Sequence, residues 1–307
     1  MIEVIGVSRR FGAVLALDDV TLSVPAGTVL GLLGHNGAGK TTLIEILTAL
    51  CRPSAGTARV AGYDVVTQAA QLRRRIGLTG QSVALDEQIS GRDNLVLIAR
   101  LLGAGRRAAR ARGGELLDAF DLAGAADRPV RTYSGGMRRR LDLAASLIGR
   151  PDVLFLDEPT TGLDPAGRRA AWQVVRELVR GGTTVMLTTQ YLDEADRLAD
   201  AITVLADGRV VASGTPAELK ARAGGRTATA RPAEAEAVTD ALYALRTIGL
   251  RADADLGAVT VPVAAPGDLA AIARALDDAP IGPYELTLTE PTLDDVYLSL
   301  MGTRRAA

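Results

Sequence analysis

Histidine and cysteine each occur only once in this 307-residue chain, and each shortage removes a class of mechanism. His35 is the only histidine, so a reaction that needs a histidine base away from that segment is excluded. Cys51 is the only cysteine, which excludes an internal disulfide and is typical of a reducing compartment. Because no cluster of cysteine or histidine accompanies it, Cys51 indicates neither a metal site nor a nucleophile.

Net charge and long apolar segments are also lacking. The formal net charge is −1, which gives no electrostatic reason to expect a nucleic-acid partner. No apolar run approaches the ~18–20 residues of a membrane span, and the first residues lack the pattern of a signal peptide. We therefore expect a cytoplasmic protein without direct membrane insertion, which reaches any membrane process through another protein.

Lysine is scarce as well, since only Lys40 and Lys220 are lysines among 35 basic residues. Lys40 belongs to Gly34-His-Asn-Gly-Ala-Gly-Lys-Thr41, a complete G-x-x-x-x-G-K-[ST] phosphate loop between an apolar run and a helical stretch. With so few lysines, an accidental match in a glycine-rich turn is disfavoured. We expect backbone N–H groups to bind phosphates, Lys40 to reach the β- and γ-phosphates, and Thr41 to face Mg²⁺. The predicted nucleotide contacts in this segment are Gly34, His35, Asn36, Gly37, Ala38, Gly39, Lys40, Thr41 and Thr42.

A second motif, Val153-Leu-Phe-Leu-Asp-Glu-Pro159, is an apolar strand that ends in two carboxylates. Adjacent acids at the end of a buried strand need a neutralising partner, and Mg²⁺ bound to a nucleotide is the natural candidate. We expect Asp157 to hold the metal and Glu158 to act as the base that polarises the attacking water. The alternative is an acidic turn with no catalytic role.

A serine followed by two glycines opens a helix at Tyr133-Ser-Gly-Gly-Met137. Such a helix start leaves N–H groups at the positive end of a dipole, which predicts a second anion site. Alone, the tripeptide would more often be an ordinary helix start. The arginines of 138–140 and 73–75 are expected to form solvated faces.

Together these motifs resemble the nucleotide-binding subunit of an ATP-binding cassette (ABC) transporter over about residues 1–220. The phosphate loop matches the Walker A motif, 153–158 matches Walker B, and Tyr133–Met137 matches the family signature. The resemblance implies that Ser134, Gly135, Gly136 and Met137 bind the nucleotide of a second copy. It also implies that Gln81 contacts Mg²⁺, that Asp164 faces the partner subunit, and that Phe11 stacks on adenine, although a core role for Phe11 competes with this.

More narrowly, the chain is similar to the daunorubicin-resistance-like branch of drug-export ATPases. Segments 78–81, 90–95, 188–196 and 290–297 carry this likeness. One position departs from the wider family, because Gln190 stands where a switch histidine usually contacts the γ-phosphate. A glutamine amide donates a neutral hydrogen bond but carries no charge and shuttles no proton, so a slow ATPase is an open alternative.

Strand and helix patterns alternate along most of the chain, and 48% of the residues are hydrophobic. The predicted fold is an α/β P-loop cassette, with a mixed sheet, flanking helices and a helical insertion, followed by a small α+β domain of ferredoxin-like type. We predict an ATP-binding domain over 1–222, its helical subdomain over about 82–150, and an accessory domain over 225–307. Near the C-terminus Leu293, Val296, Tyr297 and Leu300 share one helical face, which packs on its own domain or docks a partner.

The resemblance further implies that two copies enclose two ATP molecules head to tail, and that closing and opening move a polytopic membrane permease. It predicts a homodimer or a heterodimer, with ATP and Mg²⁺ as cofactors. Two alternatives remain open at this point. One is a cassette ATPase of soluble machinery, and the other is an ATP-gated binding module with weak hydrolysis.

Overall fold

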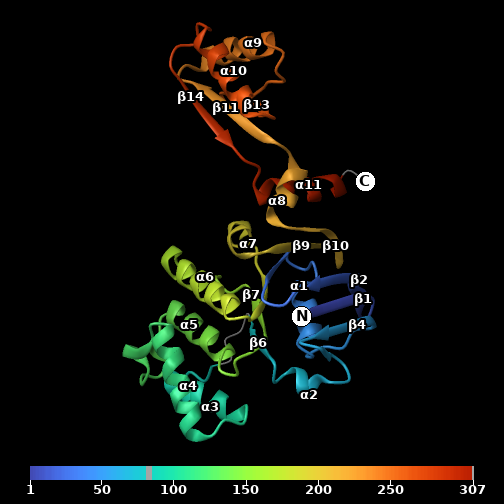
Figure 1. Ribbon diagram of the computed structural model, residues 1–307, viewed down its shortest axis with the longest axis vertical. Helices are drawn as coiled ribbons and strands as arrows, with labels where there is room; N and C mark the ends of the chain where they lie inside the picture. The colour runs from blue at the N-terminus through green and yellow to red at the C-terminus, as the bar shows by residue number, and fades with distance from the viewer. Residues whose placement is uncertain (81–84, 306–307) are drawn as a thin grey trace. The chain divides into compact units, whose positions relative to one another are not determined.

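The computed structural model describes residues 1–80 and 85–305, which form two compact units, Met1–Pro216 and Ala217–Ala307. Figure 1 labels most of the helices and strands of each unit. The domain limits predicted at 222 and 225 stay a prediction. In the described part of the chain, none of the helices combines the length and the apolar character needed to cross a bilayer.

The first unit contains two sheets, and their mixed character agrees with the predicted α/β cassette. A four-stranded antiparallel sheet has the order β2-β1-β4-β5, and a six-stranded sheet has the order β10-β9-β3-β8-β7-β6. In the second sheet only the β9–β10 pair is antiparallel. The strands are β1 (Ile2–Phe11), β2 (Val14–Val24), β3 (Val29–Leu33), β4 (Ala55–Val60), β5 (Tyr63–Asp64), β6 (Ile76–Thr79), β7 (Val153–Asp157), β8 (Thr184–Thr188), β9 (Ala201–Ala206) and β10 (Arg209–Gly214).

Helices flank these sheets, and three of them (α3, α4 and α5) build the helical part of the unit (Figure 1). Ser90 caps α3, where its hydroxyl accepts a hydrogen bond from the N–H of Asp93. The helices are α1 (Lys40–Leu47), α2 (Ala69–Leu72), α3 (Gly91–Leu101), α4 (Arg106–Ala119), α5 (Gly135–Ser146), α6 (Pro165–Arg180), α7 (Leu192–Leu198), and the short 3₁₀ turns Ala123–Ala125 and Val130–Thr132.

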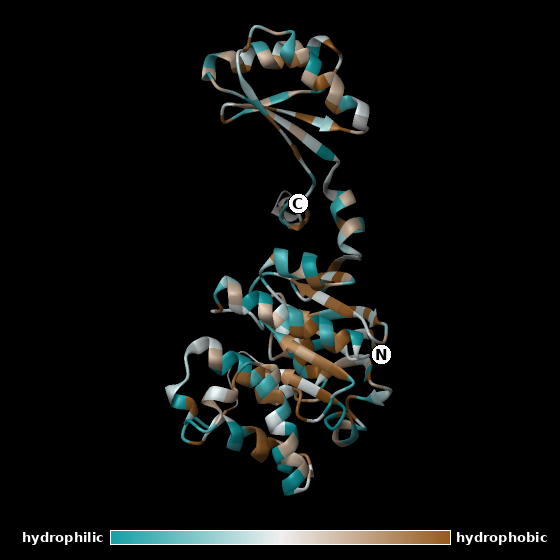
Figure 2. Ribbon diagram, turned by 60° about the vertical axis from the view of Figure 1, so that its left-hand side comes forward, coloured by the Kyte–Doolittle hydropathy of each residue, from teal (hydrophilic) through white to brown (hydrophobic). Residues whose placement is uncertain are grey.

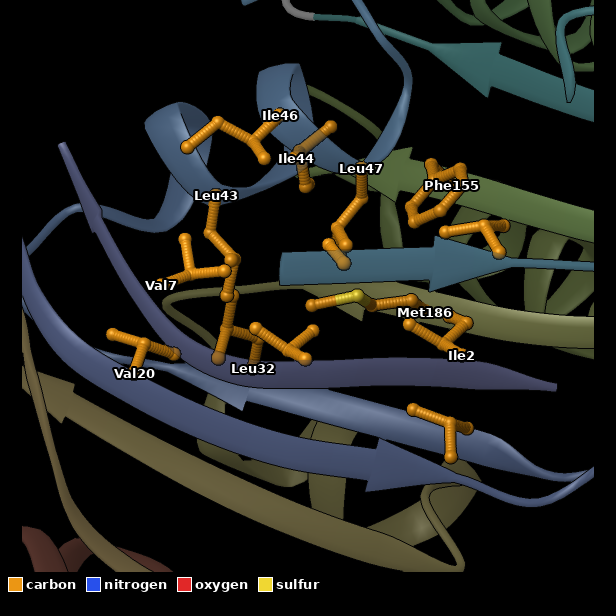
Figure 3. Packing of buried hydrophobic residues seen from close by; sticks show 14 of the residues in the cluster. Ile2, Val7, Val20, Leu32, Leu43, Ile44, Ile46, Leu47, Phe155 and Met186 are labelled. Carbon is orange, nitrogen blue, oxygen red and sulfur yellow. The ribbon is translucent and has the colours of Figure 1, made fainter. Parts of the chain in front are cut away.

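Helix α1 packs between the two sheets and joins them in one core. Leu43, Ile46 and Leu47 of this helix are fully buried against side chains of both sheets (Figure 3). Strands β3, β7 and β8 are buried at every residue, which is why they read as continuous apolar runs (Figure 2). The core therefore fixes the ends of β3 and β7, from which the phosphate loop and the two carboxylates emerge.

The second unit has the ferredoxin-like fold that the sequence predicted. Its chain order is β11-α9-β12-β13-α10-β14, and its antiparallel sheet has the order β12-β13-β11-β14. Helices α9 and α10 cover one face of that sheet around a core that includes Leu245, Val261 and Ile272 (Figure 1). The elements are α8 (Pro216–Ala223), β11 (Arg226–Pro232), a 3₁₀ turn Ala235–Ala237, α9 (Val238–Thr247), β12 (Asp253–Asp255), β13 (Ala258–Val263), α10 (Pro266–Asp277), β14 (Tyr284–Thr289) and α11 (Leu293–Arg305).

On α11, Leu293 and Val296 are buried, with exposed fractions of 3% and 5%. These two positions of the predicted apolar face are therefore already covered within the chain.

Candidate functional site: a phosphate loop facing a carboxylate turn

The phosphate loop lies between β3 and α1, in the context that the motif requires. Gly39 occupies the N-cap of α1 with a φ of 104°, a left-handed conformation that favours glycine. A Cβ atom at this position would lie 2.7 Å from the carbonyl oxygen of Ala16. Glycine is therefore required here both for its backbone angles and for space, and the first turn of α1 follows directly.

Lys40 is the first residue of α1 and is 6% exposed. Its ammonium group donates to the carbonyl oxygens of Gly34 at 2.7 Å and His35 at 3.0 Å. Burial lowers the pKa of Lys40, while the carboxylates of Glu158 and Asp157 oppose that shift. The Lys40 ammonium group is thus held at the loop by neutral carbonyl oxygens, where it can form a charge-assisted hydrogen bond with an anion.

A hollow of about 390 Å³ opens over the loop. It is polar, and among the described residues the carboxylate of Glu158 is the only acidic side chain that lines it. Its lining consists of Ala16, Asn36, Gly37, Gly39, Lys40, Thr41, Thr42 and Glu158. Most of the phosphate-loop residues predicted to bind nucleotide therefore meet the predicted base in one concave site.

Asp157 lies beside this hollow and is 4% exposed. Its carboxylate accepts a hydrogen bond from the Thr41 hydroxyl at 3.3 Å and from the Thr188 hydroxyl at 2.5 Å. Hydroxyl and carboxylate oxygens of this kind suit a hard divalent cation. No group of three or more His, Cys, Asp or Glu side chains gathers as a metal site in residues 1–80 and 85–305. A cation here would thus need ligands from phosphate or water, as Mg²⁺ commonly does.

Glu158 follows in a sharp turn with a φ of 50°, a strained angle for a residue other than glycine. Its N–H donates to the carbonyl oxygen and to the hydroxyl of Thr188, each at 3.1 Å. The Thr161 hydroxyl donates to its carboxylate at 3.3 Å. The turn is therefore fixed at the backbone, and it directs the Glu158 side chain into the hollow.

The signature segment lines a different hollow, of about 510 Å³. Ser134 caps α5 by accepting a hydrogen bond from the N–H of Met137 at 3.2 Å, and Ser134 and Gly135 are exposed. Asp164 lines the same hollow, and it caps α6 by accepting from the N–H of Gly167 at 2.7 Å. The structure therefore brings the signature and Asp164 together, apart from the phosphate loop of the same chain.

Several predicted site residues lie outside these two hollows as far as the described residues define them. Phe11 is 45% exposed, which contradicts a core role, and the Arg9 guanidinium lies 4.4 Å from its ring centre. His35 is half-exposed, and its Nε2 atom lies 3.6 Å from the Asp207 carboxylate. Gln190 is exposed just after β8. Gln81 lies outside the described residues, so its predicted contact with Mg²⁺ stays a prediction.

Two residues of the site were missed by sequence reasoning. Thr188 closes an apolar strand, where a hydroxyl gives a weak signal, yet it contacts both Asp157 and Glu158. Arg139 was assigned to a solvated face, and this was wrong. Its side chain is 12% exposed and donates to the backbone carbonyls of Asp157 and Glu158, at the end of β7. A run of three arginines gives no sign of which one is buried.

Trp172 is buried, and it also has a polar role. Its Nε1–H donates to the carboxylate of Glu194 at 2.9 Å, which links α6 to α7, the helix that follows Gln190. Burial raises the pKa of Glu194 above its ordinary value. The Arg168 guanidinium lies 4.4 Å from the ring centre of Tyr191, a second contact between α6 and the segment next to Gln190.

Restoring a histidine at the switch position will raise or preserve turnover. Gln190 is exposed, so Gln190→His needs no repacking, and an imidazole adds a group that can carry charge near a phosphate. The measurement is phosphate release by the assembled complex, with Gln173→His on α6 as a matched exposed control. A large loss of turnover in Gln190→His alone would show that glutamine has a role of its own.

A phosphate loop, a carboxylate turn and a separate signature surface on one α/β unit define a cassette-type P-loop ATPase. Comparisons with known proteins agree. Residues 17–161 match the ABC transporter family model. The chain is 53% identical to the daunorubicin resistance ATP-binding protein DrrA3 of Streptomyces coeruleorubidus, covering 99% of this chain and 96% of the relative. It is 46% identical to the daunorubicin/doxorubicin resistance ATP-binding protein DrrA of Streptomyces peucetius, covering 98% and 92%.

Among solved structures, the dimeric bacterial ABC transporter cassette MJ0796 matches with a TM-score of 0.65 and 25% identity, covering 70% of this chain and 98% of that one. The chain therefore belongs to the ATP-binding subunits of ABC transporters. It binds ATP and is an ATPase, as the phosphate loop and the family membership predicted.

Proposed function

We propose that this ATPase drives the export of a drug or another hydrophobic molecule through a separate polytopic membrane permease. The observation that supports this best is the extent of the similarity to DrrA3, which covers 99% of this chain and so includes the second unit as well as the cassette. A cassette shared with general ABC ATPases would account for only about 70% of the chain, the share that the MJ0796 cassette covers. The proposal places the protein at the inner face of the membrane, held there by the permease.

Within that function, two copies of the chain enclose two ATP molecules. The phosphate-loop hollow and the signature hollow have no lining residue in common, so a nucleotide bound at Lys40 is approached by the signature of another copy. Ser134, Gly135, Gly136 and Met137 supply N–H groups and a hydroxyl at the exposed start of α5. Asp164, in the same hollow, faces the partner subunit. The solved dimer of MJ0796 supports the assembly by analogy.

Each bound ATP is held by the residues of the first hollow and hydrolysed there. Lys40 neutralises the β- and γ-phosphates, and Phe11 stacks on adenine from its exposed position. Thr41 and Asp157, with Gln81, hold Mg²⁺, which supplies charge neutralisation at the phosphates when bound. Glu158 accepts the proton of the attacking water, and Gln190 donates a neutral hydrogen bond near the γ-phosphate.

The permease provides the decisive test of this function. The tagged chain is purified in mild detergent from membranes of the native cell, and bound proteins are identified by mass spectrometry. We expect one polytopic membrane protein, and its complex reconstituted in vesicles should transport an anthracycline only with ATP. A Lys40→Met complex is the matched control, because it keeps the permease but loses ATP. Recovery with ribosomes or DNA-repair proteins instead would contradict the proposal.

A further inference from the structure

Arg139 is a mostly buried cation that converges on the catalytic turn. Its guanidinium donates from Nε to the carbonyl oxygen of Pro159 at 2.8 Å, and from Nη2 to those of Glu158 at 2.7 Å and Asp157 at 3.1 Å. From Nη1 it donates to the carbonyl oxygen of Gly80 at 2.9 Å. Three consecutive carbonyls of the carboxylate turn therefore share one side chain.

Burying a cation among these acceptors costs desolvation free energy, which indicates that the contacts do more than pack the side chain. The acceptors are four neutral carbonyls, and in the described part of the chain Arg139 forms one ion pair, with Asp142 at 3.5 Å on the same helix. Burial lowers the pKa of Arg139, because its charge is removed from water, while the carboxylates of Asp142, Asp157, Glu158 and Glu194 oppose that shift. A planar fork with five N–H donors can bind several carbonyls in fixed directions, and a lysine ammonium cannot reproduce that pattern.

The backbone that Arg139 binds is the strained part of the site. Successive carbonyls of Asp157, Glu158 and Pro159 can point at one group only if the chain turns sharply between them, and Glu158 has a φ of 50°. Such an angle persists only where the surroundings hold it. On the opposite side the N–H of Glu158 is held by Thr188. Arg139 and Thr188 thus hydrogen-bond to the backbone of the same residue, Arg139 at its C=O and Thr188 at its N–H.

We propose that Arg139 is a positioning residue, which holds the backbone of Glu158 so that its carboxylate points at the attacking water. Arg139 also lies on α5, five residues after Ser134. It therefore links the surface that contacts one nucleotide to the base that acts on the other. This link rests on the proposed head-to-tail dimer, in which Ser134 approaches the ATP of the second copy.

The test compares Arg139→Lys and Arg139→Gln with Arg112→Gln. Arg112 on α4 is the matched control, because its side chain is 26% exposed and donates to the backbone carbonyl of Leu147, and it lines neither the phosphate-loop hollow nor the signature hollow. We expect kcat for ATP hydrolysis to fall about 100-fold in Arg139→Gln and about 10-fold in Arg139→Lys, with KM within about threefold of the wild type. Arg112→Gln should stay within about twofold of the wild type.

A second readout separates positioning from stability. Glu158→Gln is expected to trap an ATP-bound dimer, and adding Arg139→Lys to it should leave that dimer intact, since the base is already absent. If Arg139 were only structural, the double variant would lose the dimer, and KM would rise with the fall in kcat. Equal kcat values for Arg139→Lys and Arg112→Gln would overturn the inference. A wild-type chain that hydrolyses ATP but forms no ATP dimer would refute the proposed assembly instead, leaving the kcat comparison to decide the role of Arg139.

Discussion

Glu158→Gln abolishes steady-state ATP hydrolysis while ATP binding persists. Among the described residues, Glu158 is the only acidic side chain that lines the phosphate-loop hollow, so no neighbouring base can replace it. Glutamine has nearly the same shape, accepts the hydrogen bond from Thr161, and cannot take a proton from water. We expect turnover to fall by about 100-fold or more, the usual contribution of a general base, which corresponds to about 3 kcal/mol of barrier.

Two measurements on the same variant check this result. Phosphate release gives the turnover, and size-exclusion chromatography with ATP and Mg²⁺ gives the state of association, which should shift to a dimer because the nucleotide is no longer consumed. Glu285→Gln, on exposed strand β14 of the second unit, is the control and should behave as the wild type. Hydrolysis that survives in Glu158→Gln would show that the assigned base is wrong. Lost hydrolysis without an ATP dimer would contradict the sandwich assembly.

The parts of the fold that the sequence predicted well are those with strong local patterns. The sequence pattern predicts a strand over 184–188 and a helix over 192–198, and β8 and α7 have these bounds. The order of the second unit followed from alternation of the same two patterns. Strand β12, Asp253–Asp255, was missed because it is acidic and exposed at a sheet edge, where its pairing with β13 comes from the hairpin and not from its own residues.

The candidate site divides in the same way, into residues that a local motif predicts and residues that no local pattern predicts. The phosphate loop and the carboxylates are contiguous motifs, so their chemistry could be inferred before their geometry was known. Thr188 and Arg139 act through contacts with Glu158 across 30 and 19 residues of sequence. Such contacts depend on strand register and on how α5 packs, and neither leaves a local signal. The unusual φ of Glu158 is likewise invisible in the sequence, because glutamate rarely adopts it.

Lys40→Met separates two effects of the buried lysine, the free energy lost by burying its charge and the ATP affinity that this charge provides. Lys40 is 6% exposed, its ammonium group donates to the carbonyl oxygens of Gly34 and His35, and burial lowers its pKa. Methionine keeps the length of the side chain and removes the charge. We expect ATP affinity to fall about 100-fold or more, because the phosphates lose a desolvated ionic partner worth about 3 kcal/mol. The melting temperature without ATP should hardly change, since the lost hydrogen bonds are offset by relief from desolvation.

Calorimetric titration with ATP measures the affinity, and thermal unfolding with and without ATP measures the linkage between binding and stability. In the wild type, ATP at about 100 times its dissociation constant should add about 2.7 kcal/mol to the free energy of unfolding, and Lys40→Met should lose nearly all of this gain. Lys220→Met on α8 is the matched control, because it removes the only other lysine of the chain. Unchanged ATP affinity in Lys40→Met would contradict the role of the phosphate loop. We expect no large fall in melting temperature without ATP, because removing a charge that binds only neutral carbonyls should cost little stability. Such a fall would show instead that Lys40 stabilises the fold.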